Sequence, residues 1–97
     1  MTVASIELPR SKKWDGLWRI VTFDIPEKKR INRKHFSKTL DIIGMYRLEK
    51  SIFVYPHECK KEILNVADTF FVLKHVRYIK ATCIQNDEFA KKFFKLR

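Results

Sequence analysis

Residues 18–27 read Trp18-Arg19-Ile20-Val21-Thr22-Phe23-Asp24-Ile25-Pro26-Glu27. The fold of this chain is inferred from this stretch. Its β-branched and aromatic residues predict a strand, and the proline ends that strand and directs the chain toward a helix. Alternate side chains of a strand point to opposite faces, so the stretch divides into two sets. One set consists of Val21, Phe23 and Ile25, and the other of Trp18, Ile20, Thr22 and Asp24. Both sets are largely apolar, so each face of the strand needs a cover.

The remaining sequence predicts an α+β domain. Residues 1–13 have no periodicity and are interpreted as a basic, flexible N-terminal arm, residues 14–85 as the folded domain, and residues 86–97 as an amphipathic terminal helix. Within the domain, the predicted elements after the first strand are a helix at 27–43, strands at 46–49 and 51–55, a helix at 58–73 and a strand at 76–83. The order β-α-β-β-α-β is that of the ferredoxin-like fold, a four-stranded antiparallel sheet with both helices on one face.

Composition narrows the class of protein. The chain has 97 residues, of which 45% are hydrophobic, as expected for one globular domain. Its apolar runs are too short for a bilayer, and its N-terminus lacks a secretory apolar core. We therefore expect a cytoplasmic protein without a membrane partner. Cys59 and Cys83 fit no metal spacing and are interpreted as reduced thiols.

The formal net charge of +10 favours a polyanionic partner. The charge is concentrated in the first predicted helix, where six cations face only Glu27 and Asp41. These cations are Lys28, Lys29, Arg30, Arg33, Lys34 and Lys38. Such a cluster predicts contacts with the phosphates of duplex DNA or of RNA, ahead of acidic lipid. The alternative is a surface that only keeps the protein soluble.

The sheet face away from the two helices would be left open. A second copy of the chain could cover it, because a twofold dimer needs only one self-complementary patch. We expect this dimer, with Ile20, Thr22 and Asp24 in its interface. The competing cover is the terminal helix of the same chain. That helix carries Phe89, Phe93 and Leu96 on one side, which we interpret as a surface for a partner protein.

Three segments of the chain resemble two known families. Phe23-Asp24-Ile25 is similar to a strand end of CRISPR-associated protein two, the small non-integrase subunit of the spacer-acquisition complex, and Ser51-Ile52-Phe53 is similar to that family's serine-valine-phenylalanine segment. A closer local resemblance is to the Cas-like central domain of phenylacetate-degradation-type transcriptional repressors. It is carried by Lys13-Trp14-Asp15-Gly16-Leu17-Trp18-Arg19 and by Phe23-Asp24-Ile25-Pro26-Glu27.

The resemblance implies a ferredoxin-like dimer with a role in nucleic-acid binding. The first hypothesis is an architectural subunit that bridges duplex DNA with a CRISPR integrase during spacer acquisition, a step of antiviral defence. The second is a metal-dependent endoribonuclease or endodeoxyribonuclease, in which paired Asp24 carboxylates across the twofold hold Mg²⁺. The third is the dimerisation domain of a repressor. The repressors carry an upstream DNA-reading domain, and we expect 97 residues to leave no room for one. The architectural subunit is therefore the favoured hypothesis. It requires no cofactor.

Overall fold

The computed structural model describes residues 6–10 and 13–96. Strands and helices follow the predicted order, with a short 3-10 turn before α1 and another before β4. The elements are β1 (Trp18–Phe23), η2 (Glu27–Lys29), α1 (Arg30–Ile42), β2 (Tyr46–Glu49), β3 (Ile52–Tyr55), α2 (Lys60–Thr69), η3 (Leu73–His75), β4 (Val76–Ala81) and α3 (Glu88–Phe93). The predicted α+β class and β-α-β-β-α-β order are confirmed.

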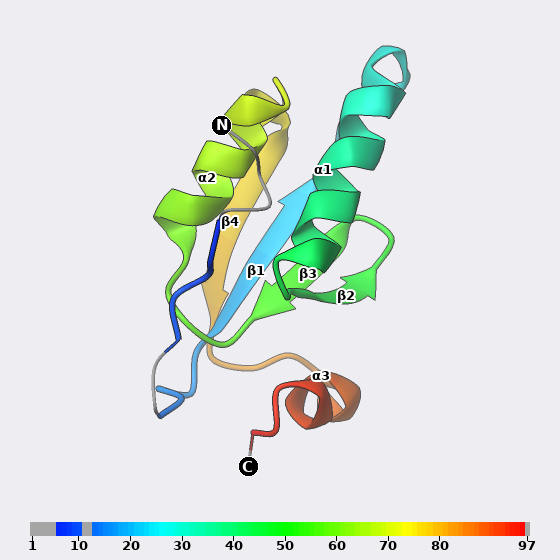
Figure 1. Ribbon diagram of the computed structural model, residues 1–97. Helices are drawn as coiled ribbons and strands as arrows, with labels where there is room; N and C mark the ends of the chain where they lie inside the picture. The colour runs from blue at the N-terminus through cyan, green and yellow to red at the C-terminus, as the bar shows by residue number, and fades with distance from the viewer. Residues whose placement is uncertain (1–5, 11–12, 97) are drawn as a thin grey trace.

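The sheet has the strand order β2-β3-β1-β4, and every neighbouring pair is antiparallel. α1 and α2 lie on the same side of it, and α3 lies beyond its lower end (Figure 1). In the centre of the sheet Val21 is opposite Phe53 on one side and Tyr78 on the other. This arrangement is ferredoxin-like, as the order of the elements predicted, and β1 is one of the two central strands.

Helix boundaries differ from the prediction by a few residues, for identifiable reasons. The helix predicted at 27–43 begins as a 3-10 turn after Pro26 and ends at Ile42, because Gly44 takes a φ of 108°, the left-handed value that glycine favours. The helix predicted at 58–73 ends at Thr69, because Phe71 takes a left-handed φ of 59° and turns the chain.

The core lies between the sheet and the two helices. Val21, Phe23 and Ile25, the first of the two predicted sets, are all buried there. They pack with side chains from both helices and the hairpin, including Phe36, Leu40, Phe53, Ile63 and Val66. Burying this continuous apolar layer is the main source of stability that the fold offers.

The segment 6–10 crosses the same core. Leu8 is buried within it, and the Tyr55 hydroxyl donates a hydrogen bond to the Pro9 carbonyl at 3.1 Å. This part of the predicted arm is therefore held by an apolar anchor and a hydrogen bond. The arm's other predicted residues, 1–5 and 11–12, lie outside the described residues, as does Arg97 at the end of the predicted terminal helix.

The terminal segment covers one end of the opposite sheet face. Trp18 and Val54 are buried there against Ala90 of α3, and the Trp18 indole donates to the Asp87 carboxylate at 2.9 Å. Ile20 and Thr22 are half-buried, and Ile79 on β4 is 38% exposed. The competing cover that we considered thus forms at one end of this face, and the rest of the face stays open to solvent in the single chain.

No helix in the described part of the chain has the length and apolar character needed to cross a bilayer.

Candidate nucleic-acid interface

The basic residues of α1 form a stripe along one side of the helix. Arg30, Lys34 and Lys38 follow one another at intervals of four residues, so their side chains are neighbours on the helix surface. Arg33 and Ser37 have the same spacing and lie beside them. Helix α1 presents Phe36 and Leu40 to the core, which leaves the stripe at the surface. The amphipathic pattern of the sequence therefore determines where the charge lies.

A cleft separates this stripe from the β2–β3 hairpin. Its volume is about 590 Å³. The lining residues come from the end of β1, from η2 and α1, and from the hairpin: Phe23, Glu27, Arg33, Lys34, Ser37, Lys38, Asp41, Arg47, Lys50 and Ser51. We call this the basic cleft, because five cationic side chains face two carboxylates.

The two carboxylates each hold one cation. Arg33 lies 3.6 Å from Glu27, and Arg47 donates to Asp41 at 3.0 Å. Among the described residues, no carboxylate pairs with Lys34, Lys38 or Lys50. These three ammonium groups leave an uncompensated positive field in the cleft.

The six predicted contact residues lie in η2 and α1, and the structure does not bring all of them together. Arg33, Lys34 and Lys38 line the basic cleft, whereas Lys29 donates to the Phe71 carbonyl at the end of α2. Lys28 is exposed in η2, and Arg30 is exposed at the start of α1. Arg47 and Lys50 were not among the residues predicted from the sequence to contact nucleic acid. The available signal was the predicted hairpin that carries them, because this fold places that hairpin next to the basic helix.

Asp24, the predicted catalytic and metal-binding residue, is exposed at the end of β1. Its backbone N–H donates to the His75 carbonyl at 3.0 Å. Within the described residues, no group of three or more His, Cys, Asp or Glu side chains could hold a metal ion. One carboxylate does not make a Mg²⁺ site, so a paired site at Asp24 requires a second copy of the chain.

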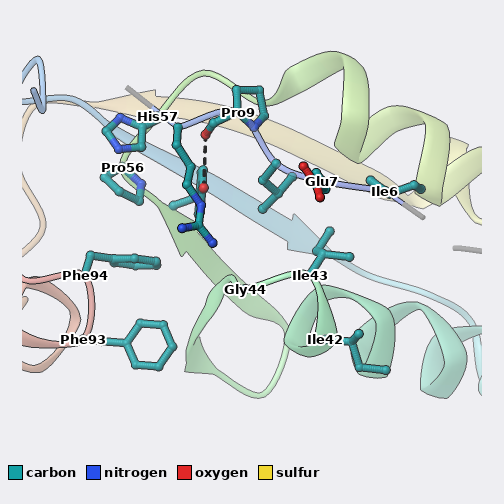
Figure 2. Close-up of a pocket in the computed structure, with 13 residues that line it drawn as sticks. Ile6, Glu7, Pro9, Ile42, Ile43, Gly44, Pro56, His57, Phe93 and Phe94 are labelled. Carbon is teal, nitrogen blue, oxygen red and sulfur yellow. Dashed lines mark hydrogen bonds between the residues drawn. The ribbon is translucent and has the colours of Figure 1, made fainter. Parts of the chain in front are cut away.

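The three apolar residues predicted as a partner surface on the terminal segment differ in their surroundings. Phe89 is strongly exposed on α3. The Phe93 ring lies 5.3 Å from that of Tyr46, and Leu96 packs against the Trp18 cluster. Phe93 also borders a groove of about 1130 Å³ between α3, the end of α1 and the segment 6–10 (Figure 2).

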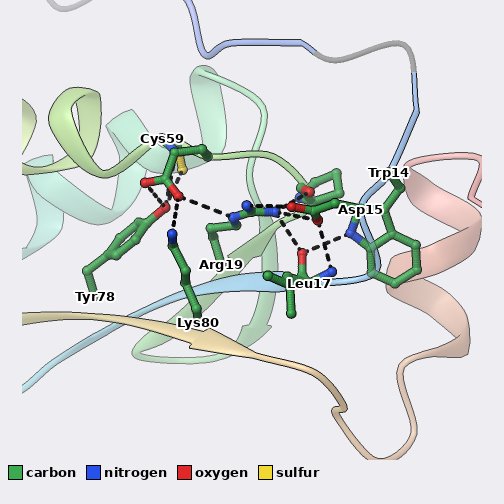
Figure 3. A network of polar contacts seen from close by, with 9 residues as sticks. Trp14, Asp15, Leu17, Arg19, Cys59, Tyr78 and Lys80 are labelled. Carbon is green, nitrogen blue, oxygen red and sulfur yellow. Dashed lines mark hydrogen bonds and ion pairs between the residues drawn. The ribbon is translucent and has the colours of Figure 1, made fainter.

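A separate polar network surrounds Arg19 at the other end of β1 (Figure 3). This guanidinium is almost fully buried and donates to both Asp15 carboxylate oxygens at 2.9 Å and to the Pro56 carbonyl at 2.9 Å. The hydrogen bonds from Arg19 and from the Leu17 N–H lower the pKa of Asp15 from 3.8 to about 2. The network fixes the turn before β1, where Gly16 has a φ of 85°.

Glu58 extends this network to β4. Its carboxylate lies 2.8 Å from Lys80, which lowers the pKa of Glu58. The Tyr78 hydroxyl donates to Glu58 and accepts the backbone N–H of Cys59, and burial raises the pKa of the Cys59 thiol to about 12. A thiol held neutral in this way is inert, which supports a structural role for Cys59. Both described cysteines are free, in agreement with reduced thiols.

Comparison with known proteins identifies the family. The chain matches the family model described as "PaaX protein central Cas2-like domain" over residues 11–92. Searches of curated proteins and of solved structures each found no match. The match spans the turn before β1, the sheet, both core helices and most of α3. This chain therefore belongs to the family of PaaX central Cas2-like domains.

Proposed function

We propose that this domain is a dimeric nucleic-acid-binding module that contacts the phosphate backbone of duplex DNA through the basic cleft and acts as a scaffold. The observation that carries the proposal is that the ammonium groups of Lys34, Lys38 and Lys50 lie in one cleft and form no ion pair with any carboxylate that the structure describes. Each group that neutralises a phosphate releases a condensed counterion, which is the main source of sequence-independent affinity for DNA.

The chemistry of the cleft favours backbone contacts over base reading. Its walls carry ammonium and guanidinium groups and the hydroxyls of Ser37 and Ser51, all of which can donate hydrogen bonds to phosphate oxygens. We therefore expect little sequence preference.

The dimer is part of the proposal. A second copy would cover the uncovered remainder of the sheet face, where Ile20, Thr22 and Ile79 lie, and would place two basic clefts on one particle. Two such clefts fit a protein that bridges duplex DNA with an integrase in spacer acquisition. The family match favours a second context, the dimerisation domain of a PaaX-type transcriptional repressor.

Catalysis is the weaker proposal. Asp24 is a single exposed carboxylate, and it belongs to no group of three or more His, Cys, Asp or Glu side chains that could hold a metal ion among the described residues. The experiment that tests the module is equilibrium binding of a labelled duplex to the parent and to cleft variants at several salt concentrations. Duplex affinity that depends on the cleft lysines supports it, and affinity that does not depend on them refutes it.

A further inference from the structure

Phe71 occupies a position that its chemistry does not suit. α2 ends with hydrogen bonds from the Phe71 N–H to the Asp68 carbonyl at 3.1 Å and from the Val72 N–H to the Ala67 carbonyl at 2.9 Å. This is a Schellman motif, which places Phe71 at the left-handed position with a φ of 59°. Glycine is preferred there, because a Cβ is strained at positive φ.

The other helices of the chain end in the same motif with better-suited residues. Gly44 takes the left-handed position after α1. Lys95 takes it after α3, where a solvated cation suits the negative end of the helix dipole. Phe71 has neither advantage, and its residue surface is 73% exposed, so the ring adds little to the core. Strain combined with an exposed ring and no internal benefit points to an external contact.

The surroundings of Phe71 are basic. Lys29 donates to the Phe71 carbonyl, and Asn32 donates to the Phe70 carbonyl at 3.0 Å, so the start of α1 lies against the end of α2. Figure 1 shows both ends at the upper end of the molecule. Lys28, Arg30 and Lys74 are exposed on these same segments, as are the apolar side chains of Ile31 and Leu73. We call these residues, with Phe71, the aromatic tip.

We propose that the aromatic tip binds a single-stranded nucleic-acid segment that continues from the duplex in the basic cleft, with an unpaired base stacked on Phe71. An exposed aromatic ring beside lysines is the combination that binds unpaired bases without sequence preference. The stripe that includes Arg30 and Lys34 runs along α1 from the tip to the cleft, so one strand can contact both. This inference rests on the proposed function and adds a preference for duplexes with a single-stranded tail.

The test compares a blunt duplex with the same duplex carrying a single-stranded tail, using fluorescence anisotropy. The parent should bind the tailed duplex more tightly, and Phe71→Gly should weaken that binding by about tenfold while leaving blunt-duplex affinity unchanged. Phe71→Trp keeps a stacking surface and should keep the preference. Ile42→Ser removes a similarly exposed apolar side chain at the opposite end of α1 and should change neither affinity.

Stability provides an independent readout. Phe71→Gly relieves the left-handed strain, so its midpoint of thermal unfolding should rise by several degrees even as tail binding is lost. A fall in the midpoint would assign Phe71 to internal packing and overturn the inference.

Three further outcomes would also overturn the inference. They are equal loss of blunt and tailed affinity in Phe71→Gly, a change of oligomeric mass in that variant, and Phe71-dependent binding of the parent to vesicles of phosphatidylserine and phosphatidylcholine. If the parent and Phe71→Gly bind both duplexes alike, the inference fails and the proposed function stands. If the parent binds neither duplex, both fail.

Discussion

Arg47 on β2 donates a hydrogen bond to Asp41 on α1 at 3.0 Å, and this contact joins the two walls of the basic cleft. The Arg47 guanidinium also lies 4.9 Å from the centre of the Phe53 ring. Both side chains of the pair are about half exposed, so the ion pair contributes roughly 0–1 kcal/mol to stability. Asp41 thus neutralises the Arg47 cation in the cleft and adds little to the stability of the fold.

Asp41→Asn should therefore strengthen duplex binding. The change removes a carboxylate that repels phosphate and frees the charge of Arg47, so we expect a several-fold gain in affinity at low salt and a steeper salt dependence. Anisotropy titrations measure the gain, and thermal unfolding should shift by only a few degrees. Unchanged or weaker binding would show that DNA does not approach this wall of the cleft.

Asp15→Asn should destabilise the fold in a pH-dependent manner. The pKa of Asp15 is lowered from 3.8 to about 2, so its ionised form stabilises the folded state above pH 4, and that contribution is lost as the pH falls toward 2. The variant also leaves the buried Arg19 with Glu58, 3.7 Å away, as its only carboxylate partner among the described residues.

Chemical denaturation between pH 7 and pH 2 measures this effect. The stability difference between the parent and Asp15→Asn should be largest above pH 4 and should narrow below it. Asp68→Asn, at an exposed carboxylate with no ion pair among the described residues, should change stability little at pH 7. A difference that is constant with pH would contradict the role assigned to the Asp15–Arg19 pair.

Asp24→Asn should bind duplex DNA as tightly as the parent. Asp24 lies outside the residues that line the basic cleft, and one carboxylate per chain is a poor Mg²⁺ site. We expect negligible Mg²⁺-dependent cleavage by the parent, measured on labelled DNA and RNA. Robust cleavage that disappears in Asp24→Asn would instead establish the nuclease hypothesis.

The parent should have the mass of a dimer at micromolar concentration. Ile79 lies opposite Ile20 on the uncovered part of the sheet and is partly exposed, so Ile79→Glu should separate the dimer without unfolding the chain. Light scattering and circular dichroism measure the two properties. A monomeric parent would refute the dimer and any paired Asp24 site with it.

Local pattern was sufficient to predict the sheet and the two sets of side chains on its first strand, but not which of the two sets faces the helices. Val21 and Phe23 alternate along β1 and Ile25 continues the alternation beyond it, while Phe36 and Leu40 recur at helical spacing, so strand and helix can be told apart from the sequence. The element order then leaves few topologies for a short α+β chain. The observed strand order follows from these local rules.

Contacts between distant residues could not be predicted in this way. Arg19 interrupts an apolar strand, and its burial depends on Asp15, Pro56 and Glu58, which no spacing rule connects. The cover that α3 gives to Trp18 depends on Asp87, whose carboxylate accepts the indole N–H instead of capping α3. The basic cleft likewise includes Arg47 and Lys50, and these two residues lie beside α1 only once the hairpin has folded.

The central claim is that the basic cleft binds the phosphate backbone, and the salt dependence of duplex affinity tests it most directly. The comparison is between the parent, a cleft variant with Lys34, Lys38 and Lys50 changed to alanine, and a control with Lys60, Lys61 and Lys92 changed to alanine. Both variants lose the same formal charge, and the control lysines are exposed on α2 and α3. The cleft variant should bind more weakly, and its slope of log affinity against log salt should be shallower than the parent's by about 2.7. The control should stay close to the parent. Equal losses in both variants, or a parent affinity that does not change with salt, would contradict the account.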